Sequence, residues 1–148
     1  MPNLGGMKFD APQFQSETEA RKYIEALRWP GGQRSCPKCG LIGAEYATKR
    51  EGRYRCSAKE CRKDFTVTTN SVMESSHIKL TVWVMAFYLM ASSKKGMSAH
   101  QLHRTLDITY KSAWFLCHRI RLAMANGGLA CLSAPYGFAR SKSSMPSI

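Results

Sequence analysis

The chain has 148 residues, 44% of them hydrophobic, so it is long enough for one ordinary domain or two very small ones. Lys and Arg number 22 against 10 Asp and Glu, and the formal charge of +12 predicts a surface that attracts polyanions, either nucleic acid or an anionic membrane. The longest apolar run, Val82–Ala91, has ten residues, whereas a transmembrane helix needs about 20, so no membrane span is expected.

The first ten residues contain no apolar core preceded by positive charge, so the sequence predicts no secretory signal. We therefore expect a cytoplasmic protein in a reducing compartment. The six cysteines are then predicted to be thiols or metal ligands rather than a disulfide framework.

Residues 1–32 are predicted to form an N-terminal arm followed by one helix. Residues 1–15 are expected to be weakly structured because they are interrupted by glycine and proline. Ser16 and Glu19 have the spacing of a capping box, in which both side chains satisfy free amides of a first helical turn. Apolar residues at helical spacing extend this helix to about residue 28, and Pro30 and Gly31 end it.

Residues 33–72 have the composition of a small β-rich segment with glycine turns. Three short strands are predicted at Glu45–Lys49, Arg53–Cys56 and Phe65–Thr69, with a turn at Glu51-Gly52 between the first two. The segment offers no substantial apolar core, so we expect something other than hydrophobic burial to stabilise it.

Residues 78–126 are predicted to form three helices. Leu80–Ser92 is apolar nearly all round, as expected for a helix with neighbours on most sides. Ser98 is the predicted cap of a second helix ending at Leu106, and a third helix is expected over Tyr110–Ala125. Residues 127–148 are expected to be a disordered tail. The predicted fold class is α+β, a small ribbon of short antiparallel strands followed by a three-helix module.

Four cysteines, in the pairs Cys36/Cys39 and Cys56/Cys61, have the spacing of a structural zinc site. Two tight turns, each carrying two sulfurs, complete a tetrahedron around one Zn²⁺, and four thiolates close its coordination shell, which is typical of structural rather than catalytic zinc. The second pair is wider than the usual two-residue separation. Two disulfides, reduced structural thiols and iron in the same cage are the alternatives.

Residues 97–114 have the spacing of apolar and turn residues that is typical of a helix-turn-helix. The third helix is predicted to turn Ala113, Cys117, Ile120 and Met124 inward, at a period of 3.6. Its N-terminal end and its basic residues are predicted to contact bases and phosphates, and the predicted DNA contacts are Arg104, Thr109, Tyr110, Lys111, Ser112, Phe115, His118 and Arg119. The alternative is a three-helix bundle with a solvated basic face.

Several long motifs occur in the order found in one group of proteins. Cys36–Gly40, Phe65–Ile78, Tyr88–Gly96 and Trp114–Arg121 resemble the N-terminal half of bacterial insertion-sequence transposases of the zinc-ribbon type, family 1595 of insertion sequences. The resemblance covers about residues 10–129. In that family a following RNase H-like domain is implied, with acidic residues that hold two Mg²⁺ for strand cleavage and joining.

The chain departs from this pattern because no Asp or Glu follows Asp107. No catalytic residue is therefore predicted, and we expect a truncated or frameshifted product that is not itself an enzyme. The predicted function is sequence-specific binding to the terminal inverted repeats of a mobile element, together with structural Zn²⁺. Full-length transposase and a second copy of the chain are further expected partners, and no membrane is expected. The alternatives are a transposase subunit that works with a separately encoded catalytic domain, and a zinc-ribbon module that binds other proteins.

Overall fold

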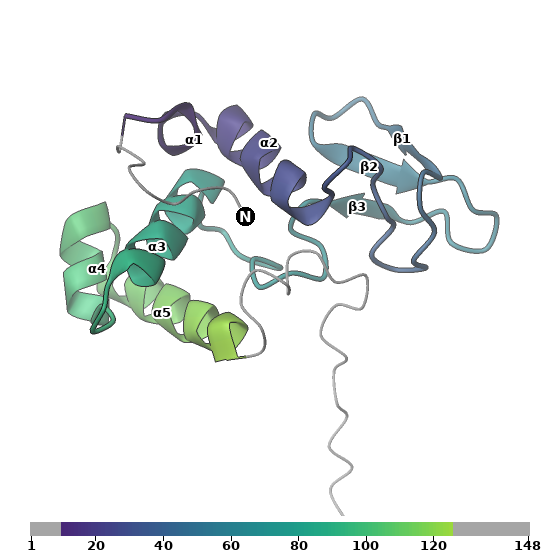
Figure 1. Cartoon of the computed structure of the whole chain (residues 1–148). Coiled ribbons are helices and arrows are strands. Elements are labelled where there is room, and N and C mark those ends of the chain that lie inside the picture. The colour runs from purple at the N-terminus through teal and green to yellow at the C-terminus, as the bar shows by residue number, and fades with distance from the viewer. Residues whose placement is uncertain (1–9, 126–148) are drawn as a thin grey trace, which may run out of the picture.

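The computed structural model describes residues 10–125 and is an α+β fold, as predicted (Figure 1). A short sheet occupies one end of the molecule, and the C-terminal helices lie at the other end. The elements in chain order are α1 (Pro12–Gln15), α2 (Glu17–Arg28), β1 (Glu45–Ala47), β2 (Arg53–Cys56), β3 (Asp64–Thr66), α3 (Leu80–Ser92), α4 (Ala99–Leu106) and α5 (Tyr110–Ala125). The predicted disordered tail at residues 127–148 lies outside the described residues.

The three strands form an antiparallel sheet in the order β1-β2-β3. The first and third strands are shorter than predicted, and the third strand is Asp64–Thr66 rather than Phe65–Thr69. The chain turns after Thr66 because the Thr69 hydroxyl accepts a hydrogen bond from the Thr66 amide at 3.0 Å. Threonine side chains that bond nearby backbone in this way compete with a strand ladder.

The N-terminal part departs from the prediction in two ways. Residues 12–15, expected to belong to a weakly structured arm, form α1, and Phe14 within it is only 3% exposed. The predicted capping box is also wrong, because the Ser16 side chain makes no capping hydrogen bond and Glu19 pairs with Lys22 at 2.8 Å. A different carboxylate, Glu17, accepts a hydrogen bond from the Leu80 amide at 2.9 Å, where α3 begins.

The ribbon has a small apolar core, contrary to the prediction, and α2 supplies part of it. The Phe65 ring lies edge-on to Trp29 at 6.3 Å and against Tyr54 at 5.8 Å between ring centroids. Phe65 and Val67 are almost fully buried. Trp29, the residue that follows α2, packs its ring against Phe65 of the sheet and is 6% exposed.

Arg28 is a buried arginine, and it joins α2 to the segment after the sheet. Its guanidinium donates hydrogen bonds to the carbonyl oxygens of Val67 and Thr69, the latter at 2.6 Å, and lies 5.1 Å from the centre of the Trp29 ring. Burial lowers the pKa of Arg28 to about 10. The side chain is charged at neutral pH, so these carbonyls compensate for its lost hydration.

The C-terminal helices begin and end where the sequence predicts. The Ser98 hydroxyl accepts from the Gln101 amide at 3.2 Å, which confirms the predicted cap of α4. Asp107 ends α4 with a left-handed backbone at φ +50°, the conformation for which glycine is common in such turns. The helix core consists mainly of Trp83, Leu102, Ala113, Leu116, Cys117, Ile120 and Ala123.

The prediction that α5 turns Met124 inward is wrong. Met124 is 40% exposed, and its neighbour Ala123 is buried instead. In the last turns of α5 the buried side follows Leu116, Ile120 and Ala123. None of the helices within residues 10–125 is both long and apolar enough to cross a membrane.

Candidate metal centre and helix-turn-helix surface

The four cysteines predicted as ligands come together in one cluster. The Sγ atoms of Cys36, Cys39, Cys56 and Cys61 all lie within 4.8 Å of one another. The Cys36–Cys61 and Cys39–Cys56 sulfur distances are 3.9 and 3.5 Å. A tetrahedral ion with metal–sulfur bonds of about 2.3 Å places its sulfurs about 3.8 Å apart, and a disulfide needs about 2.05 Å. The geometry therefore fits four thiolates around one ion and excludes bonded pairs.

The first cysteine turn is built by backbone hydrogen bonds. The Cys36 amide donates to the Leu41 carbonyl at 2.9 Å, and the Gly40 amide donates to the Cys36 carbonyl at 2.8 Å. Gly40 has φ +78°, which brings the chain back immediately after the second ligand. The Asn70 side chain donates to the Pro37 carbonyl at 2.6 Å and ties this turn to the segment after β3.

The second cysteine turn repeats this scheme despite its wider spacing. The Cys56 amide donates to the Lys63 carbonyl at 3.1 Å, just as Cys36 donates to the residue two positions after its own partner cysteine. The tight turn itself starts later, because the Arg62 amide bonds the Ala58 carbonyl at 3.1 Å. Arg62 has φ +44° and stands where Gly40 stands in the first turn. The two extra residues therefore precede the turn, and the Cys61 sulfur still reaches the cluster.

The electrostatics of the cluster depend on burial. Cys36 and Cys56 are 1% exposed, and burial raises the pKa of the Cys56 thiol to about 12. A buried thiol of this kind becomes a thiolate when a divalent cation replaces its proton. The cluster therefore fits a metal ion, which would be held by the four sulfurs.

Cations near the cluster differ in how free they are. Lys38, Arg62 and Lys63 are exposed, so they are available to offset the excess negative charge of four thiolates on a divalent ion. Arg55 is exposed as well, but it forms an ion pair with Asp64, and this contact lowers the pKa of the Asp64 carboxyl.

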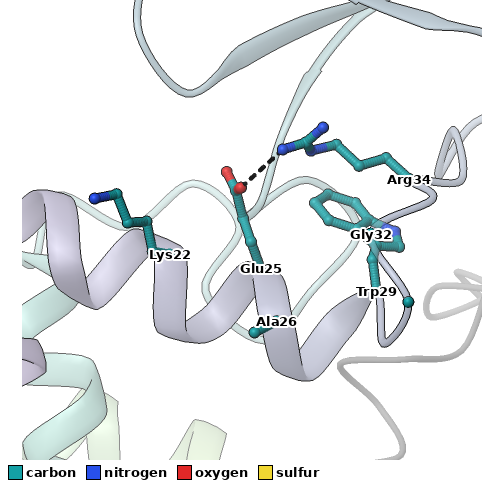
Figure 2. A pocket seen from close by; sticks show the side chains of 7 residues that line it. Lys22, Glu25, Ala26, Trp29, Gly32 and Arg34 are labelled. Carbon is teal, nitrogen blue, oxygen red and sulfur yellow. Dashed lines mark hydrogen bonds and ion pairs between the residues drawn. The ribbon is translucent and has the colours of Figure 1, made fainter.

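A hollow beside the ribbon is lined by the end of α2 and the loop that follows it (Figure 2). Arg34 lies over the Tyr54 ring at 4.3 Å and pairs with Glu25 at 3.3 Å. Glu25 also accepts the Tyr54 hydroxyl hydrogen bond at 3.0 Å, and burial together with this carboxylate raises the pKa of Tyr54. These contacts join α2 to the sheet, although the buried Arg34 Nε has no hydrogen-bond partner among the described residues.

The predicted DNA contacts fall into two groups in the structure. The first group is exposed and consists of Arg104, Thr109, Tyr110, Lys111 and His118. Ser112, partly buried, belongs with this end of α5, because its amide donates to the Thr109 hydroxyl at 3.3 Å and the two hydroxyls are 2.9 Å apart. Thr109 is therefore the N-terminal cap of α5.

Phe115 and Arg119, the second group, are engaged within the protein. The Phe115 ring is edge-on to Trp83 at 6.5 Å, and the Arg119 guanidinium lies over Phe115 at 4.5 Å. Arg119 donates to the carbonyl oxygens of Val72 and Glu74 at 2.8 and 2.7 Å. Arg119 thus fixes the segment between the sheet and α3, Phe115 packs against α3 itself, and contact of either with DNA stays a prediction.

An exposed tryptophan on α5 was not among the predicted contacts. Trp114 is 51% exposed, and its ring centroid lies 4.1 Å from that of His118. One turn earlier Tyr110 stacks on His100 at 4.4 Å. The spacing of Tyr110, Trp114 and His118, four residues apart, is the signal that identifies this outward face.

Comparison with known proteins finds a family match for the N-terminal part of the chain. Residues 15–64 match the family model of the transposase zinc-ribbon domain, which confirms the resemblance predicted from the sequence. The match includes α2, in agreement with the packing of that helix on the sheet.

A relative from Halobacterium salinarum (strain ATCC 700922 / JCM 11081 / NRC-1) is described as an uncharacterized protein in transposable element ISH50. It is 30% identical over 113 residues, which cover 75% of this chain and 37% of the relative. The chain thus spans little more than a third of the length of the relative it matches. No solved structure matches this chain.

Proposed function

Because residues 15–64 match a transposase zinc-ribbon domain, we propose that this chain is the DNA-recognition part of a transposase-related protein. In this proposal it binds the terminal inverted repeats of a mobile element in the cytoplasm. The observation that carries the proposal is the pairing of a four-sulfur cluster with a capped, exposed and basic helix-turn-helix.

The proposed cofactor is structural Zn²⁺ held by Cys36, Cys39, Cys56 and Cys61. Zinc is favoured because it accepts four thiolates in a tetrahedron without redox chemistry, and because the sulfur separations of 3.5 and 3.9 Å fit its bond length. The ion supplies cross-linking of the two cysteine turns, and the small core around Phe65 adds to that restraint.

The charge of the helical module supports a polyanionic ligand. Residues 78–125 contain one acidic residue, Asp107. Seven basic residues accompany it: Lys79, Lys94, Lys95, Arg104, Lys111, Arg119 and Arg121. Arg104 and Lys111 are exposed on α4 and at the start of α5, and Arg121 is exposed as well but donates to the Met97 carbonyl at 2.9 Å. A helix-turn-helix meets phosphates and base edges at this end of its second helix.

The potential metal ligands in the described part of the chain favour DNA recognition over DNA strand cleavage. Two-metal phosphoryl transfer uses carboxylate oxygens. Within residues 10–125, the potential metal ligands that cluster in a group of three or more are the four cysteines, and no such group contains a carboxylate. We therefore expect the chain with Mg²⁺ to bind an element-end duplex and leave it intact, and cleavage by the purified chain would contradict this part of the proposal.

The salt dependence of binding tests the proposal. The logarithm of the affinity for an element-end duplex should fall linearly with the logarithm of the salt concentration, because Lys and Arg displace counterions from phosphates. Lys111→Gln should reduce the slope of this log–log dependence by about one, because one phosphate contact is lost. Fluorescence anisotropy over a range of salt concentrations measures both quantities.

Lys22→Gln is the matched control, because Lys22 is an exposed lysine on α2, and Figure 1 shows α2 and α5 on opposite sides of α3. This variant should bind with the wild-type affinity and salt dependence. Equal losses in the two variants, or binding that is independent of salt, would overturn the proposed role of α5.

A further inference from the structure

The three tryptophans of the chain have different environments. Trp29 and Trp83 are 6% and 0% exposed, and their indole nitrogens donate to the hydroxyls of Ser35 and Ser76, both at 3.2 Å. Trp114 is 51% exposed, and its indole nitrogen has no hydrogen-bond acceptor within the described part of the chain. Two of the three indoles are therefore buried and hydrogen-bonded in the fold, and the third lies on the surface with its N–H available to a ligand.

The exposed indole belongs to a set of four rings that we call the ring face: His100, Tyr110, Trp114 and His118. His100 stacks on Tyr110, and His118 lies against Trp114, with centroid distances of 4.4 and 4.1 Å. Contacts between rings on adjacent turns restrict the rotamers of the large side chains before any ligand arrives. A restricted side chain loses less conformational entropy when it binds.

The surroundings of the ring face indicate what it meets. Lys111 precedes Trp114 by one turn of the same helix, and Arg104 is exposed on α4. The opposite side of α5 is buried through Ala113, Leu116 and Ile120, so the helix presents a single face to a ligand. A single α-helix fits the major groove of B-form DNA, where each thymine exposes its apolar C5-methyl group and an acceptor oxygen.

We propose that Trp114 is a specificity-determining residue that packs its indole against thymine C5-methyl groups in the major groove. The inference rests on the proposed function and deepens it by naming the chemical group that α5 recognises. Lys111 and Arg104 supply affinity for any sequence through phosphates, whereas the indole discriminates in favour of thymine. The indole N–H is available to donate to a base acceptor in the same groove.

Replacement of thymine by deoxyuridine tests this directly, because it removes the methyl group and leaves every hydrogen-bonding atom in place. The probe is the tightest-binding duplex recovered from a random-sequence pool, with each thymine replaced in turn. One or two positions should weaken wild-type binding about fourfold for each methyl group lost. Trp114→Ala should bind the thymine duplex less tightly and should be insensitive to replacement at those positions.

Tyr46→Ala is the matched control, because Tyr46 is a 52% exposed aromatic residue on β1 of the sheet. It should keep the wild-type affinity and the wild-type response to deoxyuridine. Tryptophan fluorescence gives a second readout, since Trp114 is the exposed indole among three. The signal should change when wild-type protein binds the duplex and should stay constant with Trp114→Phe, which retains partial affinity.

The outcomes separate the inference from the function on which it rests. If the wild type binds no duplex, the proposed function fails and the inference fails with it. If binding is tight and salt-dependent but wild type and Trp114→Ala respond equally to deoxyuridine, the function stands and the inference is wrong. Tighter binding to a duplex with unpaired bases that depends on Trp114 would also overturn it, because the indole would then stack on bases.

Discussion

Single residues in left-handed backbone conformations shape both the two cysteine turns and the turn of the helix-turn-helix. Gly40 and Arg62 each follow the second cysteine of a turn, at φ +78° and +44°, and Asp107 ends α4 at φ +50°. The sequence identifies Gly40 by its type, but Arg62 carries no such signal, because arginine rarely adopts this conformation. At Asp107 the predicted turn is confirmed, because aspartate tolerates the left-handed region better than most residues.

Substitution at Asp107 tests the strain argument. We expect Asp107→Gly to be at least as stable as the wild type and Asp107→Val to lose about 1–2 kcal/mol of unfolding free energy, because a β-branched residue is strained in the left-handed region. Urea unfolding monitored by circular dichroism gives the order. Equal stability of the valine and glycine variants would show that the turn relaxes into another conformation.

Two elements, α2 and α5, hold the same connecting segment from opposite ends. Arg28 on α2 bonds the carbonyl oxygens of Val67 and Thr69, and Arg119 on α5 bonds those of Val72 and Glu74. The segment between the sheet and α3 is therefore fixed by side chains rather than by a regular element. Backbone acceptors left without these donors would cost free energy where they are buried.

Substitution of Arg119 tests this role against a role in DNA contact alone. Arg119→Gln should lower the free energy of unfolding by about 1–2 kcal/mol, because two hydrogen bonds from a charged donor are lost. Lys111→Gln, on the exposed part of the same helix, should change it by less than about 0.5 kcal/mol. Chemical denaturation of both variants measures the difference, and equal stabilities would contradict the structural role of Arg119.

Features set by local sequence signals could be predicted, whereas contacts between distant residues could not. The bounds of α3, α4 and α5 agree with the predictions because helical periodicity and the Ser98 cap are local signals. The partner of Arg119 lies 47 residues away along the chain, and no local pattern reveals it. The four residues of α1 are too few to show a period, so that helix was missed.

At the scale of the whole molecule, the cysteine cluster and the helical core lie in different parts of the chain. The cysteine cluster was predicted in full, because the spacing of ligands along the chain is itself the signal. The packing of Trp29 on Phe65 was not predicted, since it brings together residues that are separated by the whole cluster. The predicted domain boundaries stay predictions, and α2 packs against both the sheet and α3.

Metal removal should affect these parts unequally. Chelation should release one zinc per chain and loosen the environment of Trp29, while the helices around Trp83 keep their far-ultraviolet signal, because their core contains no ligand. Cys61→Ser should lower zinc affinity at least about tenfold. Cys117→Ala, a buried cysteine outside the cluster, should still bind one zinc. Full retention of zinc by Cys61→Ser would show that the wider turn does not provide a ligand.

We propose above all that this chain, with zinc bound, recognises a specific DNA sequence. The most direct measurement is a competition titration at physiological salt between a duplex of the element's terminal inverted repeat and a duplex of the same composition in scrambled order. The repeat should bind at least about 10³-fold more tightly. Equal affinity for the two duplexes would contradict it, because a basic surface without base readout binds both alike.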